Sequence, residues 1–354
     1  MHLILVINPG STSTKVGLFE DERCLVKETL RHTVEETSPD LDRVNQANFR
    51  RKAVLKFLED NALSANSLSA IVVRGGLLKP LSSGTYIVDD NVYNDLLVAR
   101  RGWHASNLGS IIALPMGRGL NIPVYTVDPV TVDEFEPLAR YSGLNGTPRL
   151  SMSHALNMKA VARRAAYLLG KEYEEMNFIV VHLGSGISVS AHRKGKMIDV
   201  NNANEEGPFS IERCGTLPSL ALVSLCFSDK YSKNELVKKL VSRGGLFSYL
   251  GSKDFSEILN KINEGDQKAK EVVEAMAYQV SKEVGAMAAA MYGFVDRILL
   301  TGGMANSEFF TALIQDRVSF IAPVETYPGE EELEALAAGA YRVLSGEVEA
   351  LLYS

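Results

Sequence analysis

The sequence predicts an α/β protein made of two similar halves. Buried strand patterns alternate with helical patterns along the chain, which is typical of α/β folds. Two strand–turn–strand units begin near residues 4 and 178, about 175 residues apart. The chain of 354 residues exceeds what one hydrophobic core usually serves, so two domains are expected.

The first half opens with short apolar or alternating segments, which predict strands. These expected strands lie near 3–8, 15–19 and 24–30. The next expected elements are a helix at 45–63, a buried strand at 70–73, a helix at 91–101 and a buried strand at 124–127.

The second half begins with helical spacing over 154–169, which stops at Gly170, a suitable C-cap. A hairpin is expected over 178–200, with its outer turn at Lys194-Gly195. The later expected elements are helices near 216–227, 234–242, 266–292 and 330–344, and a strand at 297–300. The Gly/Ser/Pro-rich stretch 142–153 predicts the domain junction, which gives domains 1–150 and 151–330.

Composition excludes several classes of protein. A net charge of −6 argues against nucleic acid as the main partner. No apolar run reaches the ~18 residues of a membrane helix, and no basic segment precedes the short apolar N-terminal stretch. The three cysteines lack CxxC spacing, which is typical of a reducing compartment, so a cytoplasmic location is expected. The histidines form no pair with metal-ligand spacing, which argues against structural zinc.

The turn after the first strand is rich in hydroxyl groups. It carries Asn8, Ser11, Ser13 and Lys15, and such a turn can present N–H groups and hydroxyls to a phosphate. An ordinary polar β-turn would explain the same residues. The second hairpin has a comparable turn at 184–186, and a strand rather than a helix follows its glycines, which excludes a dinucleotide-binding turn. The repeat of the pattern favours two phosphate-facing hairpins.

Six motifs in a fixed order resemble the acetate/butyrate kinase family of the actin, sugar kinase and Hsp70 superfamily. They are Asn8-Pro9-Gly10-Ser11-Thr12-Ser13-Thr14-Lys15, Arg74-Gly75-Gly76, Ser153-His154-Ala155-Leu156-Asn157, His182-Leu183-Gly184-Ser185-Gly186, Glu212-Arg213-Cys214-Gly215 and Thr301-Gly302-Gly303. The resemblance implies two duplicated actin-like (ribonuclease-H-like) domains with an ATP cleft between them. It also implies that the C-terminal helix, about 331–354, joins the first domain, on the acyl-substrate side, and that 151–330 binds the nucleotide.

The resemblance is strongest to the butyrate kinase branch of the family. Pro9, the run from Arg74 to Pro80 and the segment 204–210 have that branch's style. The implied reaction converts ATP and butanoate into ADP and butanoyl phosphate by direct in-line transfer, with Mg²⁺, in a homodimer or higher homo-oligomer. Acetate or propionate is the alternative substrate.

A non-catalytic ATP switch on the same superfamily fold is the alternative from another class. A switch is expected to carry an added partner-binding domain or an assembly surface. This sequence instead keeps Arg213 and His154 together with both hairpins, so we expect an enzyme.

The resemblance implies four residues at the reaction centre: Asn8, Asp128, His154 and Arg213. Asp128 corresponds to a carboxylate near the metal, His154 to a donor on the transferring phosphoryl group, and Arg213 to a cation on its developing charge. Taken by themselves, Asp128 could cap a helix, His154 could be a polar helix-start residue and Arg213 could form a surface salt bridge.

The resemblance also assigns binding residues. The phosphate-binding set is Ser11, Ser13, Lys15, His182, Gly184, Ser185 and Gly186. The nucleotide-binding set is Lys253, Asp254, Phe255, Gly302, Gly303 and Asn306, with Ser256 where acetate kinases have Arg. Asn8, Glu330 and Glu331 are expected to act through Mg²⁺. Glu332 is an alternative to these glutamates, and the helix dipole alone would also explain three acids at a helix start.

The expected substrate side consists of Arg74, Val73, Trp103, His104 and Ser153. Two positions depart from the acetate kinase pattern. Ile71 stands where acetate kinases place an active-site arginine, and Arg74 is the nearest substitute. Ser153 stands where they have phenylalanine before the active-site histidine, which leaves room for a longer acyl chain beside Trp103.

Overall fold

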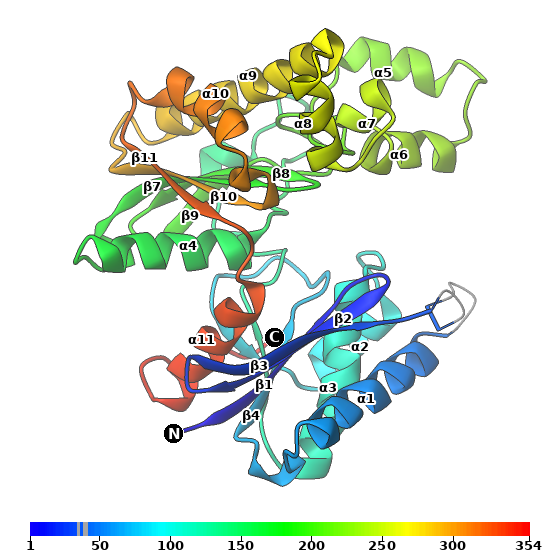
Figure 1. Cartoon of the computed structure of the whole chain (residues 1–354), viewed down its shortest axis with the longest axis vertical. Helices are drawn as coiled ribbons and strands as arrows, with labels where there is room; N and C mark the ends of the chain where they lie inside the picture. Colours follow the sequence, from blue (N-terminus) through cyan, green and yellow to red (C-terminus); the bar gives the residue numbers. More distant parts are fainter. Residues whose placement is uncertain (34–35, 38–41) are drawn as a thin grey trace. The chain divides into compact units, whose positions relative to one another are not determined.

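The computed structural model describes residues 1–33, 36–37 and 42–354 (Figure 1). The chain forms two compact units, each built around its own sheet. The first unit contains Met1–Val132 together with Glu331–Ser354, and the second contains Asp133–Glu330. In the part of the chain that the structure describes, no helix combines the length and apolar character that a membrane crossing requires.

The sheet of the first unit has strand order β3-β2-β1-β4-β6-β5. Its strands are β1 (Leu3–Pro9), β2 (Ser13–Glu20), β3 (Arg23–Arg31), β4 (Ala70–Arg74), β5 (Thr85–Ile87) and β6 (Val124–Val127). The first three strands form an antiparallel meander, β4 and β6 continue parallel to β1, and β5 closes the edge antiparallel to β6.

Helices cover both faces of the first sheet (Figure 1). They are α1 (Arg43–Asp60), α2 (Asp90–Val98), α3 (Leu108–Leu120) and α11 (Glu332–Leu344), with short 3-10 turns η1 (Ala65–Ser67) and η2 (Ala105–Asn107). Leu5 and Ile7 of β1 pack with α1 and α3, whereas α11 contacts β1, β4 and β6 through its own apolar side. Burial on both faces explains why β1 and β4 are apolar without alternation.

The sheet of the second unit has strand order β11-β10-β7-β8-β9. Its strands are β7 (Asn177–Leu183), β8 (Ile187–Arg193), β9 (Lys196–Val200), β10 (Arg297–Gly302) and β11 (Val324–Pro328). β7, β8 and β9 form an antiparallel meander, and β10 and β11 continue parallel to β7. Three antiparallel strands followed by two parallel ones repeat the core of the first sheet, so the predicted duplication is confirmed.

The second sheet is also covered on both faces. Its helices are α4 (Ala155–Leu168), α5 (Ser219–Cys226), α6 (Lys233–Ser242), α7 (Gly245–Leu250), α8 (Phe255–Asn263), α9 (Gln267–Ala290) and α10 (Glu308–Val318), and its 3-10 turns are η3 (Pro137–Arg140), η4 (Tyr173–Glu175) and η5 (Gly303–Asn306). Phe178 and Val180 pack with residues of α4, whereas Ile179 and Val181 pack with residues of α9 and α10. Helix α4 lies on one side of this sheet and α9 and α10 lie on the other (Figure 1).

The division of the chain differs from the expected boundary at residue 150. The stretch 133–149 belongs to the second unit because it bonds to that unit's strands and loops. The Glu136 N–H donates to the Ile198 carbonyl at 2.9 Å, and Arg149 pairs with Asp199 at 2.9 Å. The C-terminal segment Glu331–Ser354, with α11, lies in the first unit.

Candidate active site

The first hairpin presents its polar turn at the end of β1 and β2. Asn8 stands opposite Lys15 across the two strands, and the Gly10 N–H donates to the Ser13 carbonyl at 2.8 Å. Ser11 and Lys15 are exposed and Ser13 is half-buried, so three of the expected phosphate-binding residues are accessible on this turn.

Arg50 on α1 donates hydrogen bonds to this turn. This residue was not singled out from the sequence. Its guanidinium donates to the carbonyls of Gly10, Ser11 and Ser13 and to the Thr14 hydroxyl, all at 2.9–3.0 Å. Its side chain is 2% exposed, and burial lowers the pKa of Arg50 to about 10, so it stays charged at neutral pH. The only sequence signal was an arginine at a position of α1 that helical spacing turns inward.

A buried carboxylate lies next to Asn8. The Asn8 side-chain amide donates to Glu332 Oε2 at 2.6 Å, and Arg74 Nη1 lies 2.9 Å from Glu332 Oε1. Glu332 is 7% exposed, whereas Glu331 is exposed at the N-cap of α11. Glu332 is therefore the one of the three neighbouring glutamates that contacts Asn8, and it also neutralises part of the charge of Arg74.

Asp128 ends β6 with a left-handed backbone at φ 38°. Its carboxylate accepts hydrogen bonds from the Ser83 hydroxyl at 2.6 Å and the Gly84 N–H at 2.8 Å. The next helical turn begins only at Pro137, so the helix-cap interpretation is wrong. The side chain is 1% exposed and organises the turn that leads into β5.

The expected substrate-side residues divide between the two units. Val73 is buried in the core of the first unit, and Trp103 is 38% exposed there with the Arg43 guanidinium 4.6 Å from its ring centroid. His104 Nδ1 hydrogen bonds with the Ser106 hydroxyl at 2.8 Å. Ser153 belongs to the second unit, where it is buried and its hydroxyl lies 3.7 Å from the Met197 sulfur.

Two histidines stack in the second unit. The rings of His154 and His182 are 3.8 Å apart and tilted by 10°. His182 Nδ1 hydrogen bonds with the Asn157 side chain, and His154 Nδ1 with the Ser188 hydroxyl, both at 2.9 Å. His154 starts α4 without capping it through its side chain. The stack fixes both rings beside the second hairpin.

Glu330, the last residue of the second unit, lies beside the stacked rings of His154 and His182. Its Oε1 is 3.2 Å from His182 Nε2, although the two atoms do not meet the geometry of a hydrogen bond. A Cβ atom added at Gly184 would lie 2.9 Å from the same His182 nitrogen, so the hairpin turn closes directly over this ring.

Arg213 lies against the turn of the second hairpin. A Cβ atom added at Gly186 would be 2.3 Å from Arg213 Nη1, so only glycine leaves room for the guanidinium there. Burial lowers the pKa of Arg213, and the charge of Glu212 partly opposes this. Within the described ranges the guanidinium forms no ion pair, so the surface salt-bridge interpretation is wrong.

The expected nucleotide residues also lie in the second unit. Gly302 ends β10 at φ 93°, where a Cβ atom would be 2.5 Å from the Leu183 carbonyl, so this position requires glycine. Gly303 has open space around it, and the Asn306 side chain donates to its carbonyl at 2.9 Å.

The segment from Lys253 to Phe255 has structural partners. Lys253 pairs with Glu212 at 2.6 Å. Asp254 caps α8, and the Phe255 ring packs on Phe310 with centroids 5.4 Å apart. The structure thus ties this segment to the residue that precedes Arg213.

Comparison with known proteins gives consistent matches. A model described as the Acetokinase family matches residues 144–326, more than half of the chain. The fold is similar to an acetate kinase from Porphyromonas gingivalis, with TM-score 0.82, 20% identity, and coverage of 97% of this chain and 100% of that one. It is also similar to a propionate kinase from Francisella tularensis, with TM-score 0.75, 19% identity, and coverage of 96% and 99%. An acetate kinase from Entamoeba histolytica matches with TM-score 0.74, 17% identity, and coverage of 95% and 98%.

Proposed function

The chain belongs to the acetokinase family, and we propose that within this family of carboxylate kinases it uses ATP to phosphorylate butanoate, giving butanoyl phosphate and ADP. The second unit would bind the nucleotide and the first would bind the acyl substrate. The reaction brings two anions together, ATP and the carboxylate. It therefore needs positioned cations and hydrogen-bond donors that contact each of the two anions.

The observation that carries this proposal is the placement of Arg213 against Gly186 at the turn of the second hairpin. Phosphoryl transfer passes through a loose transition state with charge spread over the equatorial oxygens. A planar guanidinium at a phosphate-facing turn suits that charge distribution. The stacked pair of His154 and His182 adds fixed ring nitrogens in the same unit.

We propose direct in-line transfer in which His154 donates a hydrogen bond to the transferring phosphoryl group. Its Nδ1 hydrogen bonds with the Ser188 hydroxyl at 2.9 Å, which fixes the orientation of the ring, and we assign the donor role to Nε2. On the first unit, the exposed Ser11 and Lys15 would contact phosphate oxygens, and Arg74, balanced by Glu332, would face the carboxylate. Asp128 would act near the metal from the turn that it organises.

The side chains around Asn8 are chemically suited to Mg²⁺. This ion prefers oxygen ligands, and it usually keeps several waters beside one or two carboxylates and the substrate phosphates. Asn8 and Glu332 of the first unit would supply such oxygens, and Glu330 and Glu331 are the further carboxylates that we propose. Among the described residues no group of three or more His, Cys, Asp or Glu side chains could hold a metal without other ligands, so the substrate phosphates and waters would complete the coordination. Mg²⁺ held there would offset the negative charge of the substrate phosphates.

Acetate or propionate is the second candidate substrate. It is favoured by the similar solved structures, which are an acetate kinase, a propionate kinase and a second acetate kinase. Butanoate is favoured by Ser153, which stands where acetate kinases have phenylalanine. The ATP switch is disfavoured by membership of a family of phosphotransferases.

The test compares initial rates of ADP formation with acetate, propionate, butanoate and pentanoate. The highest kcat/KM with butanoate supports the proposal, and the highest value with acetate or propionate replaces it with the second candidate. No ADP formation with any of these acids would contradict the kinase itself. In the same assay Arg213→Ala is expected to lower kcat by about 10²–10³-fold, the scale for loss of one positioned donor, with little change in ATP affinity.

We also propose that the chain forms a homo-oligomer. Helix α5 supports this, because none of its residues is buried although most are apolar. Leu220 in this helix is 83% exposed, and Phe227, directly after its last residue, is 84% exposed. A second copy packed on α5 would cover this surface, and light scattering would measure the mass. The cytoplasmic location stays a prediction.

A further inference from the structure

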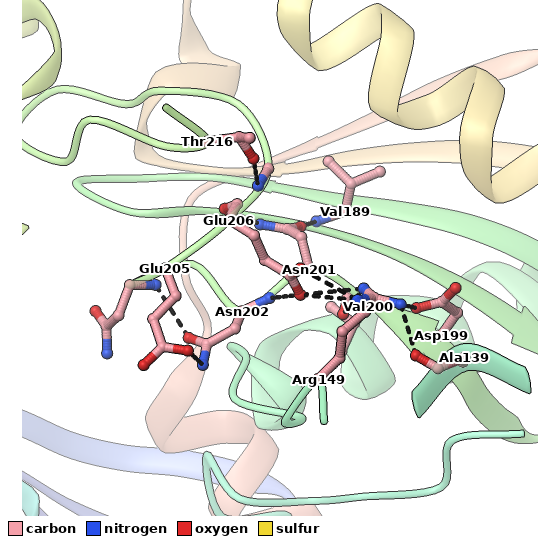
Figure 2. Close-up of polar contacts among 12 residues, drawn as sticks. Ala139, Arg149, Val189, Asp199, Val200, Asn201, Asn202, Glu205, Glu206 and Thr216 are labelled. Atoms are coloured by element: carbon pink, nitrogen blue, oxygen red, sulfur yellow. Dashed lines mark hydrogen bonds and ion pairs between the residues drawn. The ribbon is translucent and has the colours of Figure 1, made fainter. Parts of the chain in front are cut away.

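The loop from Asn201 to Thr216 carries Arg213, and its beginning is bonded to β8. The Asn201 side chain accepts from the Val189 N–H at 2.6 Å (Figure 2). It also donates to the Ile187 carbonyl at 3.0 Å. Both partners lie at the start of β8, which leaves the turn of the second hairpin. The loop therefore starts from the same strand that leaves the phosphate-facing turn.

Arg149 and Glu206 hold the next part of the loop. Arg149 pairs with Glu206 at 3.1 Å and with Asp199 at 2.9 Å, and Glu206 accepts from the Asn202 N–H at 3.0 Å (Figure 2). Gly207 and Thr216 close the loop through two bonds, each 2.9 Å long. These contacts fix the base of the loop, and Arg213 lies within the closed segment.

Ser210 connects this closed segment to the hairpin turn. Its hydroxyl donates to the Ser185 carbonyl at 2.5 Å and accepts from the Arg213 N–H at 3.2 Å. The Ser210 N–H in turn donates to the Arg213 carbonyl at 3.0 Å. The residue is fully buried, so this one hydroxyl joins the backbone of Arg213 to the turn that contains Gly186.

We propose that Ser210 is a positioning residue for Arg213, an inference that rests on the proposed function of that arginine. The long side chain of Arg213 turns a small backbone rotation into a larger displacement of its guanidinium. Without the hydroxyl, the Arg213 N–H and the Ser185 carbonyl would lose their partner in a buried site, and the backbone would shift to find others. A guanidinium displaced by about 1 Å stabilises the transition state less, while the ground-state contacts of ATP change little.

The kinetic test is a double-mutant cycle of Ser210→Ala and Arg213→Ala. Ser210→Ala alone is expected to lower kcat by about 10–10²-fold with the KM for ATP changed less than about threefold. In the Arg213→Ala background the same change should lower kcat less than about twofold, because the group being positioned is already gone. Equal effects in both backgrounds would overturn the proposal.

A second measurement does not depend on activity. Phenylglyoxal modifies accessible guanidinium groups, and peptide mass spectrometry follows Arg213, with the exposed Arg317 as internal reference. Arg213 is expected to react faster in Ser210→Ala than in the wild type, because it leaves its half-buried place. An unchanged labelling rate would overturn the proposal. Faster labelling in a protein that phosphorylates none of the acids would retain the positioning role and reject the proposed function.

The matched control is Ser281→Ala. Ser281 is also buried, but its hydroxyl donates only within α9, to the Ala277 carbonyl at 2.8 Å. Both kcat and Arg213 labelling should equal the wild-type values. If Ser210→Ala does not yield folded protein, Ser210→Cys replaces it, because cysteine keeps nearly the same side-chain size with a much weaker donor. The kinetic and labelling results expected for Ser210→Ala then apply to Ser210→Cys, and their absence would overturn the proposal.

Discussion

Adding one methyl group at Gly186 tests the placement of Arg213 without a substitution of the arginine itself. The added Cβ atom would lie 2.3 Å from Arg213 Nη1, 2.6 Å from Cζ and 3.1 Å from Nε. No positive φ is recorded at Gly186, so alanine fits its backbone. The conflict is therefore with a flexible side chain, and the guanidinium is the group that must move.

The size of the effect follows from these distances. Carbon and nitrogen atoms in ordinary contact stay about 3.4 Å apart, so Nη1 must retreat by at least about 1 Å, and a misplacement of this size costs about 10²-fold in rate. We expect Gly186→Ala to lower kcat by that factor. The end of a flexible side chain yields easily, so the free energy of unfolding should change by less than about 1 kcal/mol.

The assay measures ADP formation with saturating butanoate and ATP, beside thermal unfolding of the same samples. Gly285→Ala is the control, because a Cβ atom at Gly285 in α9 meets no atom within 4 Å. Alanine is favoured over glycine inside a helix by up to about 1 kcal/mol, so this control should be as active as the wild type and slightly more stable. A folded Gly186→Ala protein with kcat within about threefold of wild type would refute the placement of Arg213 at the reacting phosphate.

Three further predictions concern the two hairpins and the acyl side. Arg50→Met should lower the free energy of unfolding by about 2–4 kcal/mol, because several oxygens of the first turn lose their donor; a urea titration that finds no loss contradicts this role. His154→Ala should lower kcat by about 10²-fold, and no phosphohistidine that can phosphorylate the acid should be isolated after ATP treatment. Ser153→Phe should lower the preference for butanoate over acetate by about tenfold, since each buried methylene contributes about 0.8 kcal/mol; an unchanged ranking of acids contradicts the proposed role of Ser153 in substrate choice.

The hairpins could be predicted from sequence because their signals are local. The alternation over 187–191 and the turn glycines at 184 and 186 depend only on neighbouring residues, and β7, β8 and β9 formed as expected. Helix α3 was missed for a physical reason. It contains Pro115 and three glycines, which normally break helices, but a Cβ atom at Gly109 or Gly117 would collide with β4 or β6. Tertiary packing there requires residues with poor helix propensity.

The candidate site was only partly predictable, because some of its contacts depend on tertiary structure rather than on neighbouring residues. The motifs singled out Arg213, His154 and His182, which lie beside the second hairpin of the second unit, and their roles stay predictions. Arg50 and Ser210 were missed because their partners lie far along the chain, at separations that no local pattern encodes. Ser210 resembles any loop serine until the fold brings Ser185 to its hydroxyl.

The interrupted first unit has a consequence for biosynthesis. Helix α11 covers one face of the first sheet, and Glu332 bonds to Asn8 across 324 positions of sequence. A ribosome adds about 5–20 residues per second, so roughly 10–40 s pass between synthesis of Val132 and of Glu331. During this interval the nascent β1 and β4 keep an uncovered apolar face while the second unit is being synthesised, and the sequence of the second unit is complete only at Glu330, immediately before the segment that contains α11. We expect the first unit to complete its fold only after the whole second unit has been synthesised, with chaperone binding concentrated on the first unit until α11 emerges.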